Sequence, residues 1–468
     1  MMPLVQGVPW PVPRGDGDAR GIEPRAHRLS GPAWERPGAR PANRKARSVA
    51  IVIALLGATA ARADDLLQVW AQARAADPVL RQAAALSGAQ DAASRQARAA
   101  LLPQWSLQSS EQRESGGNRW NTTTSSLSQP LVDLAALRAW DASRSDASAQ
   151  ASRLVAAEQT ARQRVAEAYF GLLFAQAQLA TARANEEAFA RQVSDAEARF
   201  ASGLSAQVEA DQSRAYREIA RSNTLAAELA LADAREALAQ LIGGTAPTLQ
   251  PLRPQLAPQA LPDDAEAWGQ RALQANPELR ARELDLQASE QRISSARAGH
   301  LPTLRVGVDT QRQRGDGVSA FDAGRTPTQV ALRLTVPLFA GGATSAAADR
   351  AGFQRDAARE QLEAGRRAVL RDVRALHLAV GQGAAQLQST QAAVEAAERA
   401  LTATRTGLTL GTRTTTDLLL AIQMLAGAQN AQTQARHRHV LALLALHQAA
   451  GSLGDAELAT VNALLETR

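Results

Sequence analysis

The sequence has no cysteine, few aromatic residues and, after its first 63 residues, no lysine. Without cysteine, neither a disulfide framework nor a thiolate metal site is available. Aromatic residues make up 3% of the chain and alanine dominates the apolar class, so we expect burial through close helix contacts and not through a bulky core. No Gly-rich phosphate loop, nucleophile elbow or HExxH helix occurs, so the sequence indicates no enzyme and no cofactor.

Net charge is confined to the start of the chain. Residues 1–63 hold ten Lys and Arg against four Asp and Glu, which accounts for the whole formal charge of +6. The rest of the chain balances 42 Arg against 42 acidic residues. A nucleic-acid-binding protein would need a basic patch in its folded part, so we expect no nucleic-acid partner.

The first 63 residues read as a leader. A positive region that begins at Arg44, a short apolar run at Val49–Ala58 and a small-x-small pattern at Ala61–Ala63 predict a secretory signal peptide over 44–63. Residues 1–43 are rich in Pro, Gly and Arg without periodicity, which indicates either disorder or a misassigned translation start.

Membrane attachment through a lipid or a helix is not expected after the leader. The residue that follows the predicted cleavage point is Asp64 and not cysteine, which excludes an N-terminal lipid anchor. No later run of about eighteen apolar residues appears. A mature chain that enters a membrane would therefore do so as strands.

The remainder of the chain repeats itself. The segment Asp77–Arg81 (DPVLR) returns 199 residues later as Asn276–Arg280 (NPELR), and matching architecture follows both copies. The second copy has gained about eight residues, which we place in a loop. The expected organisation is a first structural repeat at 64–243, a Pro-rich crossover at 244–275, a second repeat at 276–451 and a tail at 452–468 that could add only a small helix.

Each repeat contains one very long helical segment. Between Asp133 and Phe200 there is no proline and one glycine, which predicts a helix of roughly 68 residues, or about 100 Å. Residues at seven-residue intervals in this helix are apolar except for Glu186, and their counterparts 208 residues later are all apolar. The first set is Val165, Leu172, Leu179, Glu186, Val193 and Phe200, and the second is Val373, Val380, Leu387, Val394, Leu401 and Leu408. A heptad seam whose second layer is mostly alanine favours close antiparallel helix pairing.

Two shorter helices in each repeat should stack end to end along the long one. The first repeat offers Pro78–Leu102 and a helix that returns from a turn at Gly203 to Gly243. In the second repeat the long helix is Ala343–Leu408, and the shorter ones are Pro277–His300 and, after a turn at Gly411, Arg413–Ala450. The Pro-rich stretch before residue 264 lacks helical periodicity and should wrap the helical body.

Two strand candidates lie between the helices of each repeat. In the second repeat, apolar residues alternate with charged or small ones over Leu304–Asp309 and Val330–Val336, as in a wall between lipid and water. In the first repeat Trp105 and Leu107 fit this pattern, but Thr122–Ser128 is almost wholly polar, which leaves a soluble hairpin as an alternative. Four strands cannot close a barrel, so we expect a dimer with eight strands or a trimer with twelve.

These patterns predict a mainly α protein with a small β part, built from duplicated long antiparallel coiled-coil hairpins and four barrel strands per protomer. The segment Gly411–Ala421 (GTRTTTDLLLA) resembles the second-hairpin tip of the TolC family of outer-membrane channel-tunnels, and Gly203–Glu209 (GLSAQVE) resembles the first. The resemblance implies a homotrimer with a twelve-stranded barrel in the outer membrane and a twelve-helix tunnel across the periplasm.

The resemblance also assigns a periplasmic gate at the hairpin tips. Arg413 matches a linking arginine and Asp417 the first of two constriction aspartates, while Glu209 replaces an aspartate in the opposite hairpin. Leu420 stands in place of the second aspartate and Leu408 in place of a linking tyrosine. We therefore expect a ring of three carboxylates and not six, a weaker cation block and a latch that depends more on Arg413. The alternative is that Arg413 and Asp417 form an ordinary i,i+4 helix pair.

Within that family, the missing lipid anchor favours a type I secretion component that exports a large protein, with an adenylate cyclase toxin as one cargo. The implied partners are a periplasmic adaptor and an inner-membrane ABC transporter or other pump. The alternatives are a multidrug efflux component, a constitutively open porin and, from another class, a soluble periplasmic coiled-coil scaffold. His437 and His439 lie two apart on a helix, which argues against a metal site.

Overall fold

The structure is a computed structural model that describes residues 63–253, 256, 261, 263–315 and 325–466. The chain divides into two units, Met1–Ala60 and Ala61–Arg468, and all described residues belong to the second. The predicted signal peptide and the segment before it therefore lie outside the described residues, apart from Ala63.

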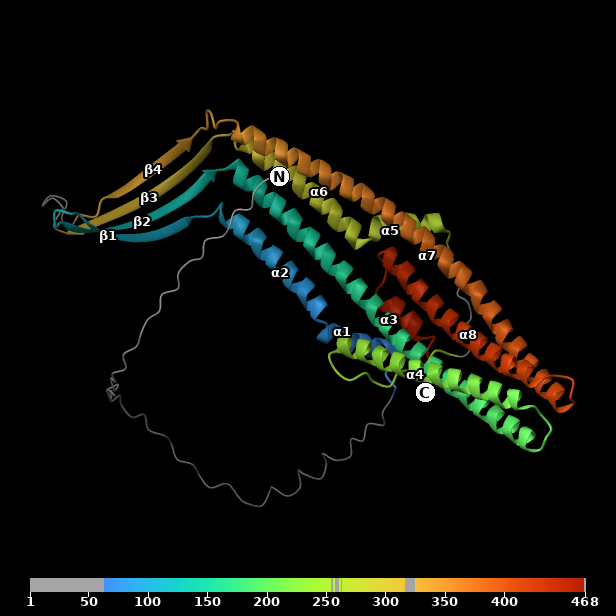
Figure 1. The fold of residues 1–468 in the computed structure, drawn as a ribbon. Coiled ribbons are helices and arrows are strands. Elements are labelled where there is room, and N and C mark those ends of the chain that lie inside the picture. Colours follow the sequence, from blue (N-terminus) through green and yellow to red (C-terminus); the bar gives the residue numbers. More distant parts are fainter. Residues whose placement is uncertain (1–62, 254–255, 257–260, 262, 316–324, 467–468) are drawn as a thin grey trace, which may run out of the picture. The chain divides into compact units, whose positions relative to one another are not determined.

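The described residues form helices and one small sheet, and the order of elements repeats (Figure 1). The first set is α1 Leu66–Ala76, α2 Pro78–Ala99, β1 Gln104–Arg113, β2 Arg119–Val132, α3 Leu134–Ala201 and α4 Gln207–Ile242. The second set is α5 Ala265–Ala275, α6 Pro277–Ala298, β3 Thr303–Gly315, β4 Thr328–Thr335, α7 Ala343–Thr409, α8 Thr415–Ala449 and a final short helix, α9 Asp455–Asn462.

The structural repeat begins one helix earlier than the repeated segments Asp77–Arg81 and Asn276–Arg280 suggest. Helix α5 falls inside the segment 244–275 that we expected to be crossover, and it corresponds to α1 in the first set. Aspartate side chains cap both helices, since Asp65 accepts from the backbone N–H of Gln68 and Asp264 from that of Ala267. Asp77 and its counterpart Asn276 cap the next helices, α2 and α6. Each is followed by a proline in the first turn of its helix.

The long helices are the scaffold on which the shorter ones pack. Helices α2 and α4 both pack along α3, and α5, α6 and α8 pack along α7, which confirms the predicted end-to-end stacking. Helix α3 also packs against α6 and α8 and so joins the two repeats. The heptad positions are buried along most of both helices, whereas Phe200 at the end of the seam is 45% exposed.

The four strands form one antiparallel sheet in the order β1-β2-β3-β4 (Figure 1). Strand β2 spans 14 residues despite its polar sequence and pairs on both sides, so the strands of the first repeat join those of the second in one sheet and do not form a hairpin of their own. Polar side chains do not prevent pairing here, because backbone groups form the ladder on both edges of the strand. The expected eight-residue insertion cannot be placed, since the connection between β3 and β4 includes 316–324, outside the described residues.

One row of apolar side chains crosses the whole sheet. Trp105 lies opposite Leu127, which lies opposite Val308, which lies opposite Val330. Because side chains alternate between the two faces of a strand, this row and the neighbouring Leu304–Leu334 and Val306–Leu332 pairs share one face. The opposite face carries polar or small residues apart from Trp120, so each of the four strands contributes to one apolar row on the other face.

None of the described helices contains a stretch both long and apolar enough to cross a membrane.

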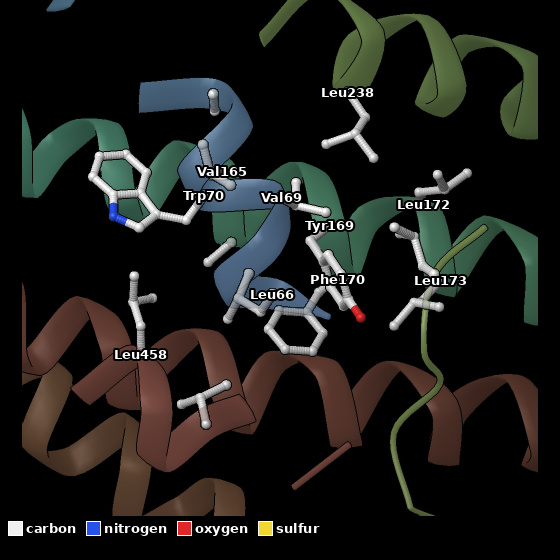
Figure 2. Close-up of a cluster of buried hydrophobic side chains, with 14 of the residues drawn as sticks. Leu66, Val69, Trp70, Val165, Tyr169, Phe170, Leu172, Leu173, Leu238 and Leu458 are labelled. Carbon is white, nitrogen blue, oxygen red and sulfur yellow. The ribbon is translucent and has the colours of Figure 1, made fainter. Parts of the chain in front are cut away.

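The largest apolar cluster among the described residues ties both ends of the folded unit to α3. Figure 2 shows Leu66, Val69 and Trp70 of α1 gathered with Tyr169 of α3 and Leu458 of α9. The Tyr169 hydroxyl lies 2.9 Å from the carbonyl of Gln250 and 3.2 Å from that of Asp64. Two isolated bridges, Asp64 with Leu249 and Leu252 with Leu465, complete the junction. The described part of the crossover is therefore held against both ends of the folded unit.

Two histidines of α8 face different neighbours, as their spacing predicts. The ring of His437 lies among Phe170 and Phe174 of α3, and His439 packs against Gly383 of α7. Both are buried, and neither Nδ1 atom has a hydrogen-bond partner. Burial, helped by the charge of Arg436, lowers the pKa of His437 to about 4.

Acid should destabilise the α3–α8 contact through this side chain. The folded-state pKa of His437 lies below its ordinary value of 6.5, so the unfolded chain binds the proton more readily as pH falls from 6.5 to 4. The stability contributed at neutral pH is lost over that window, by about 2 kcal/mol between pH 7 and pH 5. In urea unfolding followed by circular dichroism, we expect His437→Leu to remove this loss. His300→Leu, at an exposed turn, should retain it; an equal acid loss in both variants would contradict this assignment.

Candidate functional site

The candidate site lies where each long helix turns into its partner. Gly203 has φ +72° and Gly411 has φ +75°, a left-handed conformation that favours glycine. The residue after each glycine donates its N–H to a carbonyl five residues earlier, from Leu204 to Arg199 and from Thr412 to Gly407, both at 2.8 Å. The two turns therefore have the same helix-ending geometry, as the sequence predicted.

The second turn leads into a helix that begins at Thr415 and not at Arg413. Thr414 is the N-cap, and its hydroxyl accepts from the backbone N–H of Asp417 at 3.1 Å. The Asp417 carboxylate accepts in return from the Thr414 N–H at 2.9 Å, which completes a capping box. The hydrogen bond from the Thr414 N–H to the carboxylate, with smaller contributions from the Thr414 side chain and the charge of Arg413, lowers the pKa of Asp417 below its ordinary value.

Arg413 lies outside this helix and covers the preceding one. A Cβ atom added to the buried Gly407 would come within 2.6 Å of the Arg413 Cγ, so the arginine stem lies directly over that glycine. Within the part of the chain that the structure describes, Arg413 forms no ion pair with Asp417. The ordinary i,i+4 helix pair is therefore wrong, because the cap separates the two residues. The guanidinium is exposed at the turn.

Glu209 joins the two hairpins. Its carboxylate accepts a hydrogen bond from the Thr415 hydroxyl at 2.8 Å, across 206 residues of sequence, and Thr415 is buried. One turn further along, the Thr416 hydroxyl lies 3.1 Å from Gln212 Oε1. Sequence reasoning singled out Glu209 but missed Thr415, Thr416 and Gln212. The only available signal was the run of three threonines at the start of the helix.

The two leucines in place of expected polar residues have different environments. Leu408 is half-buried and packs against an apolar cluster that links α3, α4, α7 and α8: Phe189, Ala220, Leu401, Leu418, Leu419, Ala421, Ile422. Leu420 is 47% exposed on α8, one turn after Asp417. Leu408 is therefore held by packing, whereas Leu420 presents apolar surface on α8.

An open groove of about 750 Å³ lies between α3 and the α7–α8 hairpin close to these turns. Leu408, Leu418 and Ile422 form part of its apolar surface, while Arg199 and Arg405 lie at its border. Among the described residues, no group of three or more His, Asp or Glu side chains could hold a metal ion. The arrangement can hold or release helix ends through hydrogen bonds and charge.

The chain matches the sequence profile of the family described as Outer membrane efflux protein over residues 69–244 and 268–452. It is 32% identical over 426 residues to Outer membrane protein TolC of Vibrio cholerae, across 89% of this chain and 97% of that protein. It is 29% identical over 345 residues to Alkaline protease secretion protein AprF of Pseudomonas aeruginosa, across 73% and 72%. It is also 32% identical over 295 residues to Protein CyaE of Bordetella pertussis, across 60% and 62%.

Solved structures share the fold. The outer membrane protein VceC of Vibrio cholerae aligns with a TM-score of 0.72 at 22% identity, over 82% of this chain and 96% of that one. The open state of the MtrE outer membrane channel of Neisseria gonorrhoeae aligns with a TM-score of 0.71 at 23% identity, over 83% and 89%.

The bond from Thr415 to Glu209 should keep the hairpin tips closed to protease. Thr415→Val keeps the side-chain shape but removes the donor, which leaves a half-buried carboxylate without that partner at a cost of about 1.5–3 kcal/mol. We expect trypsin to cleave the native protein after Arg413 about ten times faster or more. Thr409→Val, which removes a bond within its own helix, is the matched control. Equal cleavage rates in the two variants would show that the link does not hold the tips.

Proposed function

Since the chain belongs to the outer membrane efflux protein family, we propose that it is the exit duct of a type I secretion system, which exports a large protein through a gated periplasmic tunnel. It is an outer-membrane protein, and the resemblance to the TolC family seen in its sequence is confirmed. This localisation overturns the soluble periplasmic scaffold as an alternative.

The proposed assembly is a homotrimer. Each chain contributes a four-stranded sheet whose outer strands, β1 and β4, pair on one side only among the described residues. Unpaired strand edges in hydrocarbon would leave backbone groups unsatisfied, so the edges require neighbouring copies. Three copies would give a twelve-stranded barrel and, from α3, α4, α7 and α8, a twelve-helix tunnel below it.

The choice of a protein cargo rests on the relatives. AprF is named as an alkaline protease secretion protein and PrtF of Dickeya chrysanthemi as a proteases secretion protein. CyaE also matches, but TolC of Vibrio cholerae matches at the same identity over more of the chain, so an adenylate cyclase toxin remains one hypothesis for the cargo. The proposed partners are a periplasmic adaptor and an inner-membrane ABC transporter. Multidrug efflux is the second candidate, since BepC of Brucella suis is named as an efflux protein.

We place the gate at the hairpin tips, on Arg413, Asp417, Glu209, Leu408 and Leu420. Three features support this role: the exposed guanidinium of Arg413, the ionised carboxylate of Asp417 held by its cap, and the bond from Glu209 to the other hairpin. In the trimer one Asp417 per chain would form a ring of three carboxylates, and Leu420 would add no charge to it. Arg413, unpaired within the described chain, would be free to bond a neighbouring copy.

Conductance in planar bilayers tests the gate. We expect the wild-type protein to pass little current, and Arg413→Ala or Asp417→Ala to raise the conductance several-fold because each removes a charged group from the closed tips. Arg367→Ala, at a 77% exposed side chain on α7, should leave the current unchanged. A large current through the wild-type protein would instead support the constitutively open porin.

Deletion of the gene tests the cargo class. We expect the culture supernatant to lose a large secreted protein, detectable by mass spectrometry, while susceptibility to drugs changes little. Complementation with the wild-type gene should restore the protein. Unchanged supernatant together with increased drug susceptibility would overturn type I secretion in favour of efflux.

A further inference from the structure

Arginines are concentrated at the end of the sheet farther from the helices. Arg113 of β1 lies directly opposite Arg119 of β2, and on the next rows toward the helices Asn121 lies opposite Arg314 and Thr123 opposite Arg312. Because side chains alternate along a strand, Arg312 and Arg314 point to the same face as Val308. The register puts Arg113 and Arg119 on that face too. We call these four arginines the outer rim.

On the opposite face, the strand residues described at the same height are uncharged, and Arg325, which precedes β4, lines a hollow there with Gln311 and Gln313. The pairs of that face are Gln112 with Trp120, Ser110 with Thr122, and Gln108 with Thr124, continued on β3 by Gln313 and Gln311. The charged residues of that face, Arg305, Asp309 and Arg333, lie nearer the helices. The strand arginines at this height all point to the apolar face, so the rim suits a partner that contacts that face.

Among the described residues, most of the rim charge is unbalanced. Glu111 pairs with Arg113 at 2.9 Å. In the described residues no ion pair or side-chain hydrogen bond involves Arg119, Arg312 or Arg314, and all three are exposed. Like charges directly opposite each other, as at Arg113 and Arg119, destabilise strand pairing. An external anion would relieve this repulsion.

The height of the rim corresponds to lipid headgroups. Leu304, in the apolar row nearest the helices, and Arg312 are eight residues apart, or about 26 Å along the strand at roughly 3.3 Å per residue. A strand tilt of about 40° reduces this to about 20 Å along the membrane normal, close to the apolar height of about 25 Å in outer-membrane barrels. A row with the hydroxyls of Ser125, Thr310 and Thr328 separates the apolar rows from the arginines. The polarity thus changes as hydrocarbon gives way to headgroups.

We propose that Arg119, Arg312 and Arg314 bind the phosphate groups of outer-leaflet lipids, so that the outer rim is an anionic-lipid binding surface. The guanidinium group suits this partner, because it can donate two parallel hydrogen bonds to phosphate oxygens. The inference rests on the proposed function, since the apolar face meets lipid only if the sheet closes into a membrane barrel. It adds a binding surface that is independent of the gate and of the cargo.

Fluorescence quenching by brominated lipids tests the proposal on the full mature protein. Trp105 is 78% exposed on the apolar face and would report the lipids next to the sheet. The protein is reconstituted into phosphatidylcholine vesicles with and without brominated phosphatidylglycerol, and the relative affinity for the anionic lipid is measured. We expect the wild-type protein to prefer phosphatidylglycerol. Arg312→Gln with Arg314→Gln should reduce the preference by about fivefold per arginine removed, and salt should weaken it.

Two variants separate binding from folding. Arg333→Gln removes an arginine from the opposite face and should keep the wild-type preference. Arg312→Lys with Arg314→Lys keeps the charge and should retain most of it. A preference in the double glutamine variant equal to that of the wild type would overturn the proposal.

Vesicle flotation distinguishes a failure of the lipid-binding rim from a failure of the membrane barrel. Insertion into both kinds of vesicle with no lipid preference would overturn the lipid-binding rim alone. Failure to insert into either kind would overturn the membrane barrel, and the rim with it.

Discussion

Backbone hydrogen bonding at the two outer edges of the sheet constrains the rest of the structure. In the described residues, β1 and β4 each have one neighbouring strand, while one sheet face is apolar across all four strands. That face suits lipid, yet open edges cannot remain in lipid because each unpaired group costs several kcal/mol there. Further copies of the chain would satisfy both conditions. The proposed lumen, ring of carboxylates and lipid-facing rim all depend on that closure.

Much of the fold could be predicted because its signals are local or exactly repeated in the sequence. Heptad spacing along α3 and α7 depends only on the helical period, and duplication provided an independent check. The polar strand β2 was harder, because its burial pattern is decided by the partners on both sides and not by its own composition. Helix α5 was missed for a similar reason, since a Pro-rich stretch before Asp264 obscured a short helix that starts at that cap.

The site was less predictable than the fold. The turns at Gly203 and Gly411 follow from residue type and position, and the structure has both. The start of α8 was harder to predict, because it depends on which threonine after Gly411 acts as the N-cap. The spacing of residues in the sequence does not single out Thr414. The bond between Thr415 and Glu209 joins residues that are far apart in sequence, so only the packing of one hairpin on the other reveals it. Residue type identified the acid, and tertiary structure identified its partner.

The hairpin tips and the sheet lie at opposite ends of the long helices (Figure 1), and in the proposed assembly each meets neighbouring copies for a different reason. At the sheet, copies would complete the backbone pairing; at the tips, they would give Arg413 a partner. The most direct test of this account is electron microscopy of the purified protein in detergent. It predicts a threefold particle with a continuous lumen, in which β1 of each copy pairs with β4 of the next. A single-chain particle with both strand edges free, or a solid bundle without a lumen, would contradict it.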